Sequence, residues 1–168
     1  MAIINCFAPI AAPDAKILIL GSMPGQVSLT KQEYYGHPHN LFWQIMGELF
    51  GASPHLPYAT RLQILIQNSI AIWDVLHECE REGSLDSDIQ EISIIANDFS
   101  HFFLLHPHIH SVFFNGTKAE AAFKRYILPT LKNTSHIRFT KLPSTSPANA
   151  SISKEKKLSA WKSVQSTE

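Results

Sequence analysis

The sequence predicts a single-domain α/β protein, a three-layer αβα sandwich around a four-stranded parallel sheet. Four short apolar runs, each bounded by Gly, Pro or Asn, are separated by segments with helical spacing of apolar residues. Strands that alternate with helices are typical of a parallel sheet covered on both faces. The length of 168 residues suits one domain with a sizeable core, and no internal repeat or long linker interrupts it.

Residues 16–107 are predicted to contain two strands and three helices. A strand is expected at 16–20 (KILIL), and a helix over 41–50 follows the connection 21–40. Asn40 stands at the cap position of that helix and Gly51 ends it.

A second helix is predicted at 60–68 and a second strand at 69–75. The acidic stretch 77–88 (HECEREGSLDSD) is expected to be a surface loop. The segment 97–107 is predicted to be helical, with Asn97 or Asp98 as its cap and Pro107 as its end.

The remainder contains the other two strands. They are predicted at 110–116 and 136–143, with a helix over 117–128 between them and a basic helix over 154–164 after the loop STSPANAS. We expect one domain over 1–168, with 1–15 and 166–168 as peripheral termini.

Charge is distributed unevenly along the chain, although its formal total is zero. Residues 1–100 hold 4 Lys or Arg against 11 Asp or Glu, whereas residues 101–168 hold 10 against 3. A positive half can face phosphates while the total stays at zero, although both halves could equally carry ordinary solvated helix faces. No run of 18 apolar residues exists, so no transmembrane helix is expected.

The residues with metal-binding chemistry are sparse. Cys6 and Cys79 are too few for a disulfide framework or a four-cysteine metal or iron–sulfur site, which favours reduced thiols and a cytoplasmic location. The histidine clusters 37–39 and 106–110 have no Cys or carboxylate spaced to complete a metal site. We therefore expect no cofactor and no metal. Sequence signatures of dinucleotide, nucleoside triphosphate and α/β-hydrolase sites are also missing.

Three loops rich in Gly, Pro, Ser and Asn follow predicted strands: 21–40, 115–116 and 143–151. The carboxyl ends of parallel strands meet at one edge of a sheet, where ligands bind. Each loop alone reads as an ordinary turn, but their shared position predicts a ligand crevice at that edge.

The motifs GSMPG, YYGHPHNLFW, VFFNG and LPSTSPANA, in this order, resemble the uracil-DNA glycosylase superfamily, and most closely its hypoxanthine (deoxyinosine) DNA glycosylase family. The resemblance covers roughly 16–161. It implies a monofunctional DNA glycosylase of base excision repair that acts on DNA containing a deaminated base. Hypoxanthine is the expected base, with xanthine or uracil as further substrates, and a monomer is the simplest expectation.

The resemblance also implies site residues. Met23 and Leu142 replace the Asn of GINPG and the His of HPSPLS in relatives, so neither usual catalytic group is present. The hypoxanthine family assigns catalysis to the Asn of its GHPxN segment, here Asn40. Tyr35 is implied as the ring that stacks on the base, with Asn115 and Met23 as further base-binding residues.

Phosphate contacts are implied for Ser22 and for the loop residues Ser144, Thr145 and Ser146, because hydroxyls and exposed N–H groups suit phosphate oxygens. Lys154, Lys156 and Lys157 could add nonspecific attraction to DNA.

Structural alternatives remain for each of these residues. Asn40 is also a favoured helix cap, Tyr35 could pack on the domain, and Asn115-Gly116 is a common turn pair. A second function stays open as well, that of a non-catalytic α/β protein that binds nucleosides or phosphorylated ligands in the same crevice.

Overall fold

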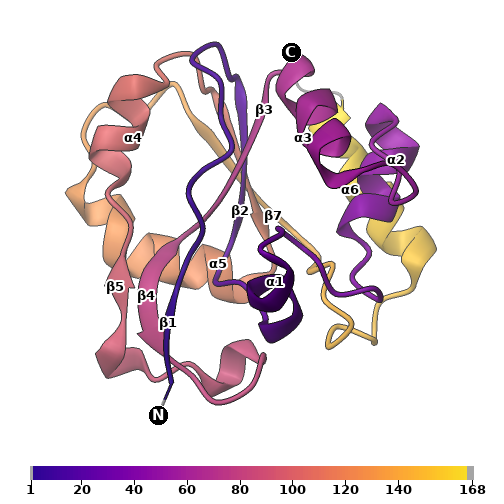
Figure 1. The fold of residues 1–168 in the computed structure, drawn as a ribbon. Coiled ribbons are helices and arrows are strands. Elements are labelled where there is room, and N and C mark those ends of the chain that lie inside the picture. Colours follow the sequence, from indigo (N-terminus) through magenta and orange to yellow (C-terminus); the bar gives the residue numbers. More distant parts are fainter. Residues whose placement is uncertain (1, 166–168) are drawn as a thin grey trace.

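The central element of the computed structural model, which describes residues 2–165, is a four-stranded parallel sheet (Figure 1). Its strands are β2 (Ile17–Gly21), β3 (Ile70–Asp74), β6 (Ser111–Asn115) and β7 (Arg138–Leu142), in the order β3-β2-β6-β7. Every residue of β2, β3 and β6 is buried, which explains why these strands read as continuous apolar runs. The predicted fold class is confirmed.

Helices cover both faces of this sheet (Figure 1). On one side lie α2 (Phe42–Phe50), α3 (Tyr58–Gln67) and α6 (Lys154–Gln165), and on the other lie α4 (Phe99–Leu105) and α5 (Thr117–Ala122). The helices expected at 41–50, 60–68, 97–107 and 154–164 are thus present within a few residues of the expected bounds.

Two separate hydrophobic cores result from the alternation of side chains along the strands. Ile17 and Ile19 of β2 belong to the core that contains Phe42 of α2. Leu18 and Leu20 belong to the core on the opposite face, with Phe99 of α4. Both faces of the sheet are therefore closed by apolar packing, and the open part of the molecule is the sheet edge.

A second, antiparallel sheet was not predicted. It consists of β1 (Ile3–Asn5), β4 (Leu76–Glu80) and β5 (Ile95–Ala96), in the order β1-β4-β5. The expectation of a surface loop over 77–88 is wrong for its first part, because β4 pairs along both of its edges and buries Cys79.

The amino-terminal segment is also part of the fold. The expectation of a peripheral terminus at 1–15 is wrong, since β1 pairs with β4 and Ile10 forms an isolated bridge with Ile72 of β3. The segment 166–168, predicted to be a peripheral terminus, lies outside the described residues.

Shorter helical turns complete the chain. Asp98 caps α4 by accepting a hydrogen bond from the His101 N–H at 3.1 Å, as predicted. The helix expected over 117–128 continues beyond α5 as a π-helical turn. The short turns are α1 (Gln26–Lys31), the π-helical turn Phe123–Ile127, and 3₁₀ turns at Asp86–Asp88, Glu91–Ser93 and Leu128–Thr130.

The strand order places a topological switch between β2 and β6. The chain passes from β2 to β3 on one side, and β6 then returns to the other side of β2. Loops that leave the carboxyl ends of β2 and β6 diverge at such a point and open a crevice there. Among the described helices, none is both long and apolar enough to span a membrane.

Candidate active site

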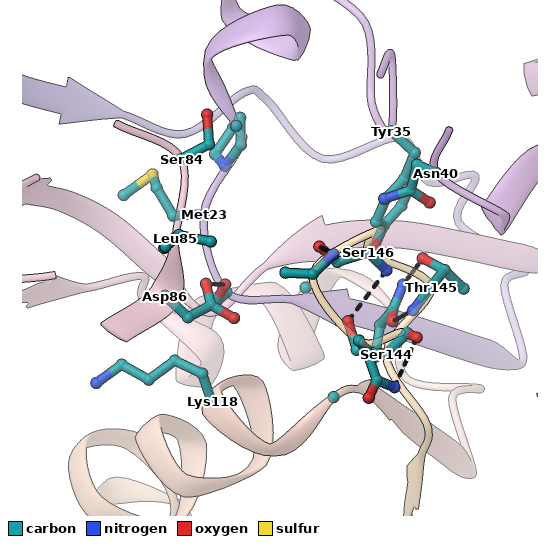
Figure 2. Close-up of a pocket in the computed structure, with 18 of the residues that line it drawn as sticks. Met23, Tyr35, Asn40, Ser84, Leu85, Asp86, Lys118, Ser144, Thr145 and Ser146 are labelled. Carbon is teal, nitrogen blue, oxygen red and sulfur yellow. Dashed lines mark hydrogen bonds between the residues drawn. The ribbon is translucent and has the colours of Figure 1, made fainter. Parts of the chain in front are cut away.

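A pocket of about 1000 Å³ lies at the carboxyl edge of the parallel sheet (Figure 2). The three predicted loops line it together with the segment 84–91, which follows β4. All residues predicted for the site line this one pocket: Ser22, Met23, Tyr35, Asn40, Asn115, Ser144, Thr145 and Ser146. The predicted crevice is present, although the roles that the resemblance implies are not equally supported by the contacts.

Asn40 is held at the wall of the pocket by its side-chain oxygen. Oδ1 accepts a hydrogen bond from the Phe42 N–H at 2.9 Å, in the first turn of α2, and thus performs the capping role considered as an alternative. The next residue, Leu41, donates its N–H to the Thr145 carbonyl at 3.0 Å. Because Oδ1 is fixed in this way, the orientation of the amide is fixed too, and its Nδ2 donor lies on the pocket side, near Tyr35 and Ser146 (Figure 2).

Tyr35 forms an aromatic wall beside Asn40. Its ring stacks on Phe42 with the centroids 4.0 Å apart and an interplanar angle of 21°. This contact covers one face of the ring, and the half-buried Tyr35 side chain lines the pocket. Burial raises the pKa of the Tyr35 phenol, and the Asp74 carboxyl adds to the effect, so the hydroxyl remains a hydrogen-bond donor.

The backbone of Tyr35 is in the left-handed region, with a φ of 54°. This conformation is unfavourable for a bulky residue and persists only where neighbours enforce it. Here Tyr34 donates its N–H to the Tyr58 hydroxyl at 2.9 Å, and Gly36 donates its N–H to Ser28 Oγ at 2.9 Å. The two flanking bonds hold the Tyr35 ring in the pocket.

Asn115 binds the third loop in this structure. Its Oδ1 accepts from the Thr145 N–H at 2.9 Å, and its Nδ2 donates to Thr145 Oγ1 at 3.0 Å. Thr145 is 1% exposed, so both of its polar groups are satisfied inside the protein. These contacts do not support the expected phosphate contact of Thr145, and they show that Asn115 anchors the loop. The base-binding role of Asn115 stays a prediction.

The rest of this loop is fastened from behind by α6. Lys157 donates its ammonium to the Asn149 carbonyl at 2.7 Å, and Trp161 donates its indole N–H to the Pro143 carbonyl at 2.9 Å. Lys157 is 3% exposed, so the expectation that it attracts DNA from the surface is wrong. Ser144 and Ser146 are half-buried at the pocket, which keeps them as the loop's candidates for phosphate contact.

The first loop is joined to the unpredicted segment after β4. Ser22 is buried and donates its hydroxyl to Asp86 Oδ1 at 2.6 Å, and Arg81 donates its Nη2 to the Pro24 carbonyl at 2.6 Å. A hydroxyl bonded to a carboxylate stands in a negative environment, so the expected phosphate contact of Ser22 is not supported. Met23 is 7% exposed and presents an apolar side chain to the pocket.

Sequence reasoning missed Asp74, which ends β3 and lines the pocket. It is 3% exposed, and its Oδ2 has no hydrogen-bond partner among the described residues. The signal was the same as for Asn115, a polar residue at the end of a buried apolar strand.

The Asp74 carboxyl is held in an environment that disfavours its charge. Burial, and secondly the nearby Asp86 carboxylate, raise its pKa to about 7, while Arg81 acts in the opposite direction. Arg81 donates its Nε to the Gly83 carbonyl at 2.8 Å and its Nη2 to the Pro24 carbonyl, while its Nη1 has no partner among the described residues. Asp74 is therefore neutral in a large fraction of molecules at neutral pH.

Because of the Asp74 carboxyl, we expect the free energy of unfolding to decrease as pH rises from about 4 to about 7. Folded Asp74 binds its proton more tightly than unfolded Asp74, so its contribution is complete below the unfolded pKa and is lost above the folded one. A raise of about three pKa units corresponds to roughly 4 kcal/mol. In thermal melts from pH 4 to pH 8, the Tm of Asp74→Asn should decrease less with pH than the Tm of the wild type. The exposed Asp88→Asn serves as the control, and equal slopes for all three proteins would contradict the assignment.

The histidine clusters do not assemble into a metal site within residues 2–165, where no group of three potential ligands converges. His106 Nδ1 lies 2.8 Å from the Phe102 carbonyl, and His110 Nδ1 lies 3.0 Å from Ser111 Oγ. Both contacts are with groups of the protein itself.

Comparisons with known proteins agree with this geometry. The sequence profile of the Uracil DNA glycosylase superfamily matches residues 8–165. A hypoxanthine DNA glycosylase of Methanosarcina barkeri is 41% identical over 114 residues, covering 67% of this chain and 71% of that protein. A hypoxanthine DNA glycosylase of Methanosarcina acetivorans is 37% identical over 159 residues, covering 94% and 95% of the two chains.

A solved structure has the same architecture. It is the solution NMR structure of a Methanosarcina acetivorans protein described as a candidate uracil DNA glycosylase, with a TM-score of 0.80 and 35% identity. The similarity covers 98% of this chain and 97% of that one.

Proposed function

The chain belongs to the uracil DNA glycosylase superfamily, and from this membership we propose that it hydrolyses the N-glycosidic bond of hypoxanthine in DNA. The observation that carries the proposal is the single pocket that both Asn40 and Tyr35 line (Figure 2). Xanthine and uracil are proposed as further substrates, because they share with hypoxanthine a ring carbonyl next to a ring N–H.

The reaction adds water to C1′ of the deoxyribose while the bond to the base nitrogen breaks. The bonding electrons leave with the base, which ends as free hypoxanthine after gaining a proton, and the DNA keeps an abasic site. Because negative charge develops on the base, donors fixed in place before the reaction lower the barrier. Asn40 Nδ2 is such a donor, since Oδ1 is already held by Phe42. A free lone pair on Oδ1 can also orient the attacking water.

Access to the base requires that the nucleotide leave the duplex, as enzymes that act on bases generally require. We propose that the flipped base stacks on the face of the Tyr35 ring opposite Phe42, a contact worth ~1–3 kcal/mol per base. Ser144, Ser146 and the exposed lysines Lys141 and Lys154 are proposed to contact the DNA backbone on that side of the pocket. We also propose that the protein is a monomer and acts in the cytoplasm.

The test uses a duplex oligonucleotide with one deoxyinosine. We expect a cut at the lesion after alkali and an intact strand without it, because no pocket lysine is assigned a covalent step. Parallel duplexes with deoxyxanthosine or deoxyuridine rank the substrates. Persistent binding to the deoxyinosine duplex without an abasic product would instead favour a non-catalytic binding protein.

We also expect excision to be independent of metal ions. Dialysis against a strong chelator should leave the single-turnover rate unchanged, because the proposed chemistry uses only the Asn40 amide and a water molecule. A rate that is lost on chelation and restored by one added divalent metal would contradict this mechanism.

A further inference from the structure

Two buried polar atoms at the floor of the pocket lack hydrogen-bond partners among the described residues: the Tyr35 hydroxyl oxygen and Asp74 Oδ2. An unsatisfied buried polar group costs about 1–3 kcal/mol, so such groups are rare unless a ligand or water completes them. Both atoms belong to residues that line the same pocket. Their lack of partners therefore points to a ligand that supplies the missing bonds.

The two groups meet above Gly21, at the end of β2. A Cβ added to Gly21 would lie 2.7 Å from Asp74 Oδ1 and 3.0 Å from the Tyr35 hydroxyl. Gly21 pairs with Asp74 in the parallel register, which brings the carboxyl to the same level of the sheet edge. Any other residue at 21 would fill the space that brings these polar groups together.

The Tyr35 hydroxyl and Asp74 lie where the far edge of a base stacked on the Tyr35 ring is expected. The Tyr35 ring stands against Phe42 and its hydroxyl reaches down to Gly21. A planar base on the opposite face of the ring would extend parallel to it. The far edge of that base would then lie level with the phenol oxygen, beside Asp74, whose Oδ2 has no partner among the described residues. Asn115 also faces the phenol, but its amide is bonded to Thr145.

We propose that Asp74 is a specificity-determining residue whose neutral carboxyl binds the edge of the flipped base, with one oxygen donating and the other accepting. The inference rests on the proposed function. A neutral carboxyl pairs with a ring carbonyl and its adjacent N–H through two parallel hydrogen bonds, which is the pattern that hypoxanthine presents at O6 and N1. An ionised carboxylate offers acceptors only and repels the ring carbonyl.

The surroundings of Asp74 keep this donor form populated. Burial and the Asp86 charge raise its pKa to about 7, and Arg81, which opposes them, is bonded to the carbonyls of Pro24 and Gly83. The titratable and charged groups that face Asp74 from the elements packed against it are Cys6, Tyr34, Tyr35, Arg81 and Asp86. Because its pKa is about 7, Asp74 changes protonation between pH 6 and pH 8.

Asn115 does not compete for this role. It ends the strand β6, but both ends of its amide are bonded to Thr145 at 2.9 Å and 3.0 Å. Reading the base with Asn115 would require breaking the anchor of the third loop, whereas Asp74 has an oxygen without any partner.

The test compares wild type, Asp74→Asn and Asp74→Leu, with Asp88→Asn as the matched control on the exposed loop. Single-turnover excision from a deoxyinosine duplex is measured from pH 5.5 to pH 8.5. The wild-type rate should fall as pH rises through about 7, up to about tenfold per pH unit, because the donor form is lost. Asp74→Asn keeps a donor and an acceptor and should give a profile without this fall. Asp74→Leu should excise about 10- to 100-fold more slowly than the wild type below pH 6, and its profile should also lack this fall.

A second measurement does not depend on catalysis. NMR titration with free hypoxanthine should show binding to the wild type that weakens from pH 6 to pH 8, and no such weakening for Asp74→Asn. Asp74→Leu should bind hypoxanthine at least tenfold more weakly while it binds a duplex with an abasic-site analogue as the wild type does. If the wild type binds hypoxanthine in this way but releases none from DNA, the proposed function fails and the role of Asp74 stands. Hypoxanthine binding by a folded Asp74→Leu protein within threefold of wild type would overturn the proposal.

Discussion

Replacing Asn40 by alanine should lower single-turnover excision of hypoxanthine by about 10²–10³, the usual cost of removing one aligned donor at a site of developing charge. The variant removes Nδ2, which faces the pocket, and Oδ1, which accepts from the Phe42 N–H. Loss of the cap alone costs ~1 kcal/mol of stability. The folded protein should therefore bind DNA nearly as well as the wild type while the chemical step is slow.

The matched variant is Asn40→Asp, which separates the two contacts of the side chain. Aspartate accepts from the Phe42 N–H as asparagine does and is favourable at a helix N-terminus, so α2 should be as stable as in the wild type. It cannot donate, however, and it puts a negative charge beside a leaving base. We expect Asn40→Asp to melt like the wild type and to excise as slowly as Asn40→Ala. Wild-type excision by folded Asn40→Asp would leave Asn40 only its capping role.

Asn115→Ala should have the second largest effect, and it should act through the third loop. The substitution leaves the buried N–H and hydroxyl of Thr145 without partners, at about 1–3 kcal/mol for each group. Thermal unfolding should shift accordingly. Affinity for a duplex with an abasic-site analogue should fall by about tenfold or more, because Ser144 and Ser146 lose their fixed position.

A double-mutant cycle with Thr145→Val tests this role directly. If Asn115 anchors the loop, the double variant should be less destabilised than the sum of the single variants, with a coupling of about 0.5–3 kcal/mol. Ser146→Ala is the control, since its hydroxyl accepts only from Ala148 within the same loop. If Asn115→Ala and Thr145→Val change the free energy of unfolding additively, the two side chains act independently. A role for Asn115 in binding the base would then be favoured over the anchoring role.

The parallel sheet could be predicted because its signal is local. The runs at β2, β3 and β6 are buried on both faces, so their sequences are apolar throughout and each is followed by a turn. The second sheet could not be predicted in this way. β4 alternates buried and exposed residues within an acidic stretch, and its partners β1 and β5 are only three and two residues long. Their pairing depends on contacts between distant parts of the chain.

The position of the site was predictable, but the assignment of its side chains was only partly so. The motifs predicted that Tyr35, Asn40 and Asn115 lie at one edge of the sheet, because each lies at or after the carboxyl end of a predicted parallel strand. In the structure all three line one pocket. Sequence could not show that Asn115 is bonded to Thr145, because the bond spans 30 positions. It also gave no means of recognising Asp74 as unpaired, since this depends on which neighbours turn toward it in the folded chain.

We propose that the pocket lined by Asn40 hydrolyses the bond between hypoxanthine and deoxyribose. The stoichiometry of the two products tests this hydrolysis most directly. A deoxyinosine duplex is incubated with excess enzyme, free base is quantified by mass spectrometry, and abasic sites are quantified with an aldehyde-reactive probe before any alkali is added. We expect one free hypoxanthine per abasic site and intact strands with the wild type, and both products formed about 10²–10³ more slowly with Asn40→Ala. Strand breaks without free hypoxanthine, or equal release of hypoxanthine by folded Asn40→Ala, would contradict this proposal.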